Sequence, residues 1–464
     1  MPVLSGSRLA ELKTERLNQG PPVILLTLYL PIIFSHGIIN QMKVFKFGGA
    51  SVSNLDRIRQ ITGILGLYKK EKMLIVISAM GKTTNALEKV AEAFYDNRKE
   101  EALLLFKEVK EHHLTTAKYL LVTNYLQTEK RLGDFFTEIE WILHGRPQKP
   151  FDYYYDQVVC IGELLSTAII SAYLNERGFI NRWVDVRDIL RTDAHFRDAV
   201  IDWEYTGQKV NQEILPLFVN QDLVITQGFI GSTDENESTT LGREGSDYTA
   251  AVFANLLDAS SLVIWKDVEG VMNADPRQFP EAQWISELNY AEVIEMAYYG
   301  AQVIHPKTIK PLQNKNIPFY VRCFLDPALP GTVIHNNPVH GLPPIVVLKN
   351  NQVLLNLSSK DFSFVGEKPT AELYHLFDEI KIKPNLFQIG AINLKVCLDD
   401  KPEKIEQLAI SASALFDVQL EKGLTLLTIR HYRGDEWEKL TIGKKIMLRQ
   451  QSPETIQLLL REGN

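Results

Sequence analysis

From Met42 onward the chain alternates short runs rich in β-branched residues with longer stretches of helical periodicity. Doubly wound α/β folds, in which helices cover a mainly parallel sheet, have this order of elements. The sequence predicts strands over residues 43–47, 73–78, 182–186, 223–227, 261–265 and 317–321. Glycine and polar residues follow several of these strands, so we expect a functional site at their carboxyl ends.

A helical stretch and a second domain extend this unit. Between about residues 86 and 147, apolar residues such as Ala102, Phe106 and Val109 recur at spacings of three and four, which predicts a helical subdomain. Proline, glycine and asparagine then accumulate over residues 329–344, which indicates a linker. We therefore expect one domain over residues 42–335 and another over residues 345–464.

The second domain has the element order of a ferredoxin-like α+β unit. Strands are predicted at 353–357, near Leu386, around Leu394 and at 424–429, and helices around Leu373 and over 402–415. The tail predicts a strand pair at 439–442 and 445–448, then a helix capped by Ser452 with Pro453 at its first position. Sheets of this kind often pair, so a homodimer or higher homo-oligomer is expected.

Composition and charge exclude several classes of protein. Over 464 residues, 50 Lys and Arg against 57 Asp and Glu leave a net charge of -7, so no nucleic-acid partner is expected. Cys160, Cys323 and Cys397 form no C-x-x-C pair, which favours a reducing cytoplasm over a disulfide framework or zinc site. The uncharged run at 23–34 is too short to span a membrane. Residues 1–41 are expected to be a disordered extension, or to precede a natural start at Met42.

The first predicted strand runs directly into Gly48 and Gly49, with Lys46 before them and Ser51 after them. Glycines let backbone N–H groups approach an anion, and a lysine at the strand end supplies a cation for a phosphoryl group. A helix is expected next, with Ser53 or Asn54 as its N-cap. Taken alone, this short pattern also fits a plain turn.

A more specific pattern runs from Gly242 to Asp247 and leads into an expected helix at 248–257. Arg243 offers a carboxylate two parallel donors, and Asp247 lies where its charge can orient a lysine or a Mg²⁺-bound water. A purely structural turn rarely needs all of these features. Lys266 and Asp267 follow another strand, and by their residue types alone they also fit a solvated surface loop.

Seven motifs occur in the order found in aspartokinases, which the chain resembles from Met42 to about Arg430: KFGGAS, GELLST, GFIG, TTLGREGSDYTA, DVEGV, DPR and GAQVIHP. The resemblance implies the amino-acid-kinase fold, a three-layer unit with a mainly parallel sheet, followed by a ferredoxin-like ACT domain. It implies that ATP with Mg²⁺ phosphorylates the side-chain carboxylate of L-aspartate, the first step toward lysine, threonine and methionine. An amino-acid effector is expected at the ACT domain. Only about 30 residues follow Arg430, so the second ACT unit is expected to be incomplete and the enzyme monofunctional.

Carried over position by position, the resemblance assigns roles to individual residues. Lys46 and Asp247 are expected to be catalytic, the lysine contacting the phosphoryl group and the aspartate positioning the lysine. Glu163 would face the substrate ammonium and Arg243 a substrate carboxylate. The substrate pocket would be completed by Thr84, Phe229, Thr240 and Ser246. The nucleotide is expected at Lys46, Gly48, Gly49, Ser51, Lys266, Asp267, Met272, Arg277 and Gln302. No side chain is assigned as a direct metal ligand.

Several residues depart from the motifs of the family. Ala50 and Lys266 replace threonines, Met272 replaces a tyrosine and Gln302 replaces a lysine. Lys266 adds a cation near the nucleotide where Gln302 removes one, so we interpret the pair as a compensating swap. In the second domain, Asn385 stands where lysine-sensitive members carry an aspartate, so classical inhibition by lysine is not expected.

Two other hypotheses stay open from the residues. Under the first hypothesis, the chain is another carboxylate or phosphate kinase of the same fold. Under the second, it is a catalytically weak or inactive amino-acid sensor that acts through its ACT-like domain. The GREGSD block and the ACT-like tail disfavour the first hypothesis. An assay of turnover separates the second from an active kinase.

Overall fold

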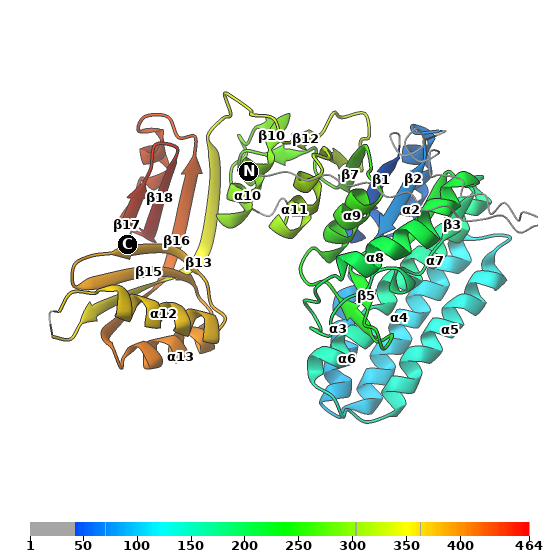
Figure 1. Ribbon diagram of the computed structural model, residues 1–464, viewed down its shortest axis with the longest axis horizontal. Coiled ribbons are helices and arrows are strands. Elements are labelled where there is room, and N and C mark those ends of the chain that lie inside the picture. Colours follow the sequence, from blue (N-terminus) through cyan, green and yellow to red (C-terminus); the bar gives the residue numbers. More distant parts are fainter. Residues whose placement is uncertain (1–41, 70, 302–303, 362, 464) are drawn as a thin grey trace, which may run out of the picture.

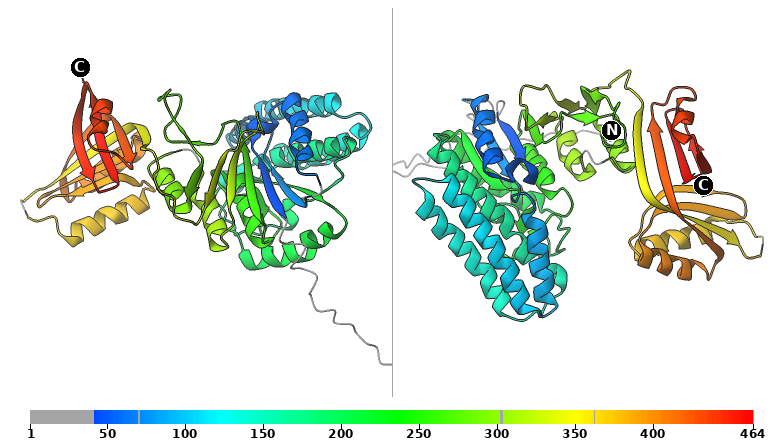
Figure 2. Two further views of the ribbon diagram at one scale, coloured as in Figure 1. Left: turned by 90° about the horizontal axis from the view of Figure 1, so that it is seen from above. Right: turned by 180° about the vertical axis from the view of Figure 1, so that it is seen from behind.

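The computed structural model describes residues 42–69, 71–301, 304–361 and 363–463 (Figure 1). The expectations for residues 1–41 and for Gln302 therefore lie outside the described residues. Two sheets organise the chain, one of eight strands and one of six. The smaller sheet forms one end of the molecule, and the helices that follow β2 form the other end (Figure 2).

The larger sheet is mainly parallel, as the sequence predicted. Its strands lie in the order β10 (Glu287–Asn289), β12 (Thr332–His335), β11 (Phe319–Cys323), β7 (Ser261–Lys266), β1 (Lys43–Phe47), β2 (Met73–Ile77), β4 (Leu223–Gln227) and β3 (Asn181–Trp183). All neighbours from β11 to β3 are parallel, while β12 is antiparallel to β11. Two of the six predicted strands are displaced, since β3 ends at Trp183 and β11 begins at Phe319.

Helices cover both faces of this sheet, which confirms the three-layer arrangement. Phe45 on β1 packs its ring against Tyr68, which follows α2 (Leu55–Gly66). Lys46, the next residue, reaches Asp247 on α9 (Gly245–Leu256). Because successive side chains of a strand point to opposite faces, α2 and α9 lie on opposite sides of the sheet.

A bundle of helices follows β2, as expected for residues 86–147 (Figure 1). It contains α3 (Thr83–Tyr95), α4 (Lys99–Leu120), α5 (Tyr125–His144) and α6 (Phe151–Val159), and α7 (Ile161–Glu176) continues from it to the sheet. Ala102, Phe106 and Val109 on α4 are buried, which confirms the predicted apolar face. Among the described residues, only the segment Phe151–Glu176 is long and apolar enough to cross a membrane, and 89% of it is buried inside the protein, as in a core helix.

Short elements complete the first unit. They are η1 (Gly49–Val52), η2 (Val186–Asp188), α8 (Trp203–Lys209), η3 (Val210–Ile214), η4 (Leu215–Val219), β5 (Ile230–Ser232), β6 (Ser238–Thr240), β8 (Val271–Met272), β9 (Trp284–Ile285), α10 (Tyr290–Tyr298) and α11 (Pro306–Asn314).

The smaller sheet contains the predicted β-α-β-β-α-β unit. Its strands lie in the order β14 (Pro384–Ile389), β15 (Asn393–Asp399), β13 (Ile345–Ser359), β16 (Phe416–Arg430), β18 (Thr455–Glu462) and β17 (Lys444–Gln451). The helices α12 (Glu367–Glu379) and α13 (Pro402–Ala412) pack through Leu373 and Leu408 on a core that includes Val353 and Leu394. The ferredoxin-like order is therefore confirmed.

The predicted tail is wrong in two places. Residues 436–441 form the helical turn η5 (Glu436–Thr441), and the segment after Pro453 is the strand β18 rather than a helix. Leu458 packs against Leu427 on one face of the sheet, and Leu459 packs against Leu426 on the other. A strand buried on both faces is a continuous apolar run, which periodicity cannot distinguish from a buried helix.

Several contacts attach the smaller sheet to the first unit, and two of them involve the strands β13 and β16 directly. Arg430, the last residue of β16, donates from Nε and Nη2 to the two carboxylate oxygens of Glu292 on α10, at 3.1 and 2.8 Å. Val346 on β13 donates its N–H to the carbonyl oxygen of Asn273, at 2.7 Å. Both side chains of the Arg430–Glu292 pair are buried, so the junction is a desolvated ion pair rather than a flexible surface contact.

Candidate active site

A cavity of about 590 Å³ lies at the carboxyl ends of four parallel strands. Gly48 follows β1, Ser78 follows β2, Phe229 lies just after β4 and Asp267 follows β7, and all four residues line it. Helix α9 begins beside it, and α7 contributes its first turn. A cavity therefore lies at the edge of the sheet where we expect the functional site.

The structure brings most of the predicted residues into this one cavity. Its lining includes Lys46, Gly48, Gly49, Ser51, Thr84, Glu163, Phe229, Thr240, Arg243, Ser246, Asp247, Lys266 and Asp267. Met272 and Arg277 line a neighbouring cavity of about 640 Å³ instead. Lys266 and Asp267 line both cavities and so stand between them.

A buried carboxylate lies between two lysines at the centre of the first cavity. Oδ1 of Asp247 is 2.6 Å from Nζ of Lys46, and Oδ2 is 3.6 Å from Nζ of Lys266. Burial by itself would raise the pKa of Asp247, but the two ammonium groups outweigh it and hold the pKa below the ordinary value of 3.8. Asp247 is therefore ionised at neutral pH, and it fixes the position of Lys46.

The glycine turn after β1 is tightly enclosed. A Cβ atom on Gly49 would lie 2.9 Å from the carbonyl oxygen of Ala79, so a larger residue there would displace backbone. The helix expected after this turn begins at Leu55, with Asn54 as its N-cap accepting from the N–H of Arg57. Ser51 donates its hydroxyl to the carbonyl oxygen of Trp265, at 3.3 Å, and so links β1 to β7.

The second glycine turn has left-handed backbone at two residues. Gly242 has φ +76°, and a Cβ atom there would meet Asp198 at 2.7 Å. Glu244 also has a positive φ, and α9 begins immediately after it, three residues earlier than predicted. Arg243 is exposed where it lines the cavity, whereas Ser246 is buried in the first turn of α9. The turn therefore exposes the guanidinium of Arg243 above the buried first turn of α9.

Glu163 provides a second, unpaired carboxylate. Its Oε1 accepts the N–H of Ala79 at 3.3 Å, while Oε2 is buried and has no hydrogen-bond partner among the described residues. Burial raises the pKa of Glu163 to about 8, although the Ala79 N–H and the charge of Lys46 lower it. A buried carboxylate without a partner is costly, so a bound cation would be favoured beside Glu163.

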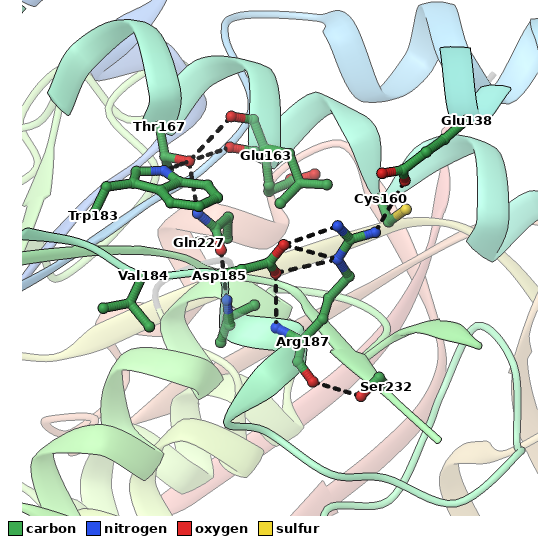
Figure 3. A network of polar contacts seen from close by, with 12 residues as sticks. Glu138, Cys160, Glu163, Thr167, Trp183, Val184, Asp185, Arg187, Gln227 and Ser232 are labelled. Atoms are coloured by element: carbon green, nitrogen blue, oxygen red, sulfur yellow. Dashed lines mark hydrogen bonds and ion pairs between the residues drawn. The ribbon is translucent and has the colours of Figure 1, made fainter. Parts of the chain in front are cut away.

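A polar network fixes the helical turn that carries Glu163 (Figure 3). The Thr167 hydroxyl donates to the backbone oxygen of Glu163 at 2.8 Å, and it accepts from Gln227 on β4 and from Trp183 on β3. Gln227 in turn accepts the N–H of Val186 at 2.7 Å. The position of Glu163 is thus tied to two strands of the sheet.

Sequence reasoning missed several residues at this site, and three of them lie close together. Tyr155 and Arg197 line the cavity, and the Arg197 guanidinium lies over the Tyr155 ring at 4.2 Å from its centroid. Asp156 lies behind them, completely buried. They come from separate segments that carry no glycine or charge pattern, so only the folded chain brings them together.

The neighbouring cavity is more apolar and has walls from both units of the protein. Met272 is the last residue of β8, Phe279 lies on the loop between β8 and β9, and Met296 lies on α10. Residues 345–348 belong to β13 of the smaller sheet. Arg277 is paired with Asp275, at 2.8 Å, and this pair lowers the pKa of Asp275 to about 2. The cavity therefore offers apolar walls for a flat ring and charged groups at its edge.

Comparisons with known proteins agree with this geometry. Residues 41–323 match the model of the amino acid kinase family. Lysine-sensitive aspartokinase 3 of Escherichia coli is 32% identical over 401 residues, which cover 84% of this chain and 87% of that protein. Bifunctional aspartokinase/homoserine dehydrogenase 1 of Zea mays is 34% identical, and the match covers 64% of this chain but 32% of that protein. The crystal structure of E. coli aspartokinase III with aspartate and ADP superposes with a TM-score of 0.76 at 30% identity, covering 90% of this chain and 96% of that one.

Proposed function

Because the chain belongs to the amino acid kinase family, and within it to the aspartokinases, we propose that it is an aspartate kinase. It transfers the γ-phosphoryl group of ATP to the side-chain carboxylate of L-aspartate and forms 4-phospho-L-aspartate. One observation supports this most directly, namely that Lys46, held by Asp247, shares a cavity with the unpaired carboxylate of Glu163. The cavity thus has a cation for a phosphoryl group and an anion for an ammonium.

The first cavity holds an opposite charge for each end of the aspartate zwitterion. Glu163 pairs with the substrate ammonium, and Arg243 binds a substrate carboxylate through two parallel N–H donors. Thr84, Phe229, Thr240 and Ser246 form the remaining wall of this pocket. Binding of the ammonium gives Glu163 the partner that it lacks in the empty cavity.

The nucleotide occupies the second cavity and reaches the first through Lys266 and Asp267. Met272 and Arg277 line the part farther from Lys46, where an adenine ring and a ribose fit between apolar walls and charged groups. The γ-phosphoryl group then lies near Lys46 and the glycine turn of Gly48 and Gly49. Gln302 is assigned to the same nucleotide from its motif alone.

Transfer between these sites requires positioning and charge neutralisation. The attacking carboxylate is already ionised at pH 7, so it needs no general base. Its approach to a phosphoryl group is opposed by electrostatic repulsion, which Lys46 and the backbone N–H groups of the glycine turn reduce. Asp247 keeps the Lys46 ammonium in place.

The residues present fit Mg²⁺ bound with ATP. Protein sites for this ion often use one or two carboxylates together with substrate phosphates and water. Asp247 and Asp267 line the first cavity, and no group of three or more metal-ligating side chains occurs in the described part of the chain. When bound, the ion neutralises charge on the phosphates, and Asp267, which is exposed, would hold it.

The smaller sheet serves as an ACT-like regulatory domain for an amino-acid effector. The E. coli relative is named lysine-sensitive, but Asn385 provides no charge for a lysine ammonium here. Asn385 instead accepts from Lys349 at 2.7 Å and donates to Asp399 at 2.8 Å. We therefore assign an effector other than lysine. We also propose that the enzyme is cytoplasmic and homo-oligomeric, and that it serves lysine, threonine and methionine biosynthesis.

A hydroxamate assay with ATP, Mg²⁺ and L-aspartate tests the proposed activity. An aspartate kinase gives acyl phosphate that hydroxylamine traps, whereas an inactive sensor gives thermal shifts with amino acids and no turnover. Adding lysine, threonine or methionine to the same assay tests the effector. Absence of acyl phosphate from a folded protein would overturn the proposal.

A further inference from the structure

Asp156 is a fully buried carboxylate that the proposed mechanism does not use. It lies on α6, and its Oδ2 accepts the N–H groups of Arg197, at 3.0 Å, and Thr240, at 2.8 Å. Its Oδ1 accepts the hydroxyl of the same Thr240, at 2.7 Å. Arg197 and Thr240 both line the first cavity, but they belong to segments more than 40 residues apart. Asp156 therefore joins two walls of the cavity from behind.

We propose that Asp156 is a positioning residue for aspartate binding, because its carboxylate sets the direction of the Thr240 hydroxyl. The inference rests on the proposed function, in which Thr240 belongs to the substrate pocket. An ionised carboxylate can only accept hydrogen bonds. While Asp156 is ionised, the Thr240 hydroxyl hydrogen points toward it and away from the cavity.

Protonation of Asp156 reverses this hydrogen bond. The two N–H groups both point at Oδ2, so the proton is accommodated on Oδ1, which then donates to the Thr240 oxygen. The Thr240 hydroxyl hydrogen is released and can donate to a substrate carboxylate near Arg243. Burial raises the pKa of Asp156 to about 7, although the hydrogen bonds from Arg197 and Thr240 lower it. The reversal therefore falls within the physiological pH range.

Other charged and titratable groups surround Asp156. On and around α6 they are Asp152, Tyr155 and Cys160, and α7 adds Glu163. The others are Glu88 on α3, Arg197 on the loop between η2 and α8, and the Lys149–Glu237 pair beside β6. Glu163 titrates near the same pH, since its pKa is about 8. A test must therefore cancel the contribution of Glu163.

Asp156→Asn supplies this test, because asparagine reproduces the protonated form. Its Oδ1 can accept the two N–H groups and its Nδ2 can donate to Thr240. We expect the ratio of the wild-type aspartate KM to the variant aspartate KM to be near one at pH 6. The ratio should rise about threefold to tenfold at pH 8.5. At that pH Asp156 of the wild-type protein is ionised and holds the Thr240 hydroxyl hydrogen away from the cavity, whereas the asparagine of the variant does not. Glu163 is unchanged in both proteins, so its titration cancels, and kcat at saturation should stay within about twofold.

Thr240 variants report the same property if Asp156→Asn does not fold. For Thr240→Val, the ratio of variant to wild-type aspartate KM should be largest at pH 6 and approach one at pH 8.5. Thr240→Ser keeps the hydroxyl and should follow the wild-type pH profile. Asp134→Asn, which removes an exposed charge from α5 and not from the surroundings of Asp156, is the matched control and should give a flat ratio.

The outcomes separate the two proposals. A wild-type protein that does not phosphorylate aspartate overturns the proposed function. An active wild-type enzyme with a pH-independent ratio for Asp156→Asn overturns the role of Asp156. If Asp156→Asn changes thermal stability and kcat by the same amount at every pH, then Asp156 has a purely structural role, and this result also overturns the inference.

Discussion

The Nζ atom of Lys46 lies 2.6 Å from Oδ1 of Asp247, and both side chains are buried at the carboxyl end of the central strand β1. Lys266 approaches the other carboxylate oxygen at 3.6 Å. The ammonium of Lys46 is thus fixed before any substrate binds. Such preorganisation lowers a barrier because no reorientation is needed during the reaction.

Lys46→Ala should lower kcat by at least ~10², with little change in the aspartate KM. In the proposed mechanism the lysine stabilises charge that develops during transfer, whereas aspartate is held mainly by Glu163 and Arg243. Steady-state kinetics of acyl phosphate formation measures both constants. Lys43→Ala, on the same strand but outside the cavity, is the control and should keep its activity. Near-normal turnover of Lys46→Ala would remove the assigned role.

Glu163 predicts a pH dependence of aspartate binding. Its pKa is about 8 in the empty site, so at pH 7 most molecules must lose a proton before they can pair with the substrate ammonium. Calorimetry at pH 7 in buffers of different ionisation enthalpy should show proton release from the protein on aspartate binding. Glu163→Gln should abolish this release and weaken aspartate binding. Equal proton release by the variant would contradict the assignment.

Stability of the empty protein should report the same carboxyl group. In the unfolded chain it ionises near pH 4.5, so between about pH 4.5 and pH 8 the folded state holds one more proton than the unfolded state. This contribution to the free energy of unfolding therefore falls as pH rises through that window. Chemical denaturation of Glu163→Gln should show a smaller loss of stability between pH 5.5 and pH 8 than the wild-type protein shows. An identical pH slope for the two proteins would mean that the carboxyl is not buried as described.

Lys266→Thr should raise the ATP KM, because it removes a cation at the junction of the two cavities. If Lys266 compensates for Gln302, then adding Gln302→Lys to this variant should restore the ATP KM. Lys315→Thr removes a lysine that lines neither cavity and serves as the control. An unchanged ATP KM in Lys266→Thr would count against the compensating swap.

The Arg430–Glu292 pair should contribute strongly to the attachment of the smaller sheet to the first unit. Removing one partner of a buried ion pair leaves the other charge unpaired, which costs about 3 kcal/mol or more. Burial raises the pKa of Glu292, but Arg430 and His431 outweigh it and lower it below 4.5, so the pair stabilises at neutral pH and is lost as pH falls below that value. Glu292→Gln should lower the thermal midpoint, whereas Glu295→Gln, at a more exposed carboxylate, should have a small effect. Equal changes in the thermal midpoint for Glu292→Gln and Glu295→Gln would contradict the larger contribution assigned to the Arg430–Glu292 pair.

The position and most of the lining of the site were predictable from sequence, because motifs carried them. Strand ends followed by glycines and charges can be read in one dimension, and parallel strands place their carboxyl ends together. Lys46 and Asp247 are far apart in the sequence, yet each lies in a motif of its own. Their contact follows from the order of strands β1 and β7 in the sheet.

Other features depend on burial and on contacts that no local pattern records. Asp156 looks like any helical aspartate until the fold removes it from water and places Thr240 beside it. The strand β18 was mistaken for a helix because both of its faces are apolar. The contribution of β13 to the second cavity could not be foreseen either, because it depends on how the two units dock.

The length of β13 gives the protein a mechanical property. Its 15 residues extend over roughly 50 Å, from the second cavity to the core under α12 and α13. The ladder with β16 is irregular between Lys349 and Gln352, where Asn351 has a positive φ, so the strand has a pivot partway along its length. A rotation of about 5° at this pivot would move an end about 25 Å away by about 2 Å. In that case the strand would act as a lever, and a small tilt under α12 and α13 would change the width of the cavity beside Lys266.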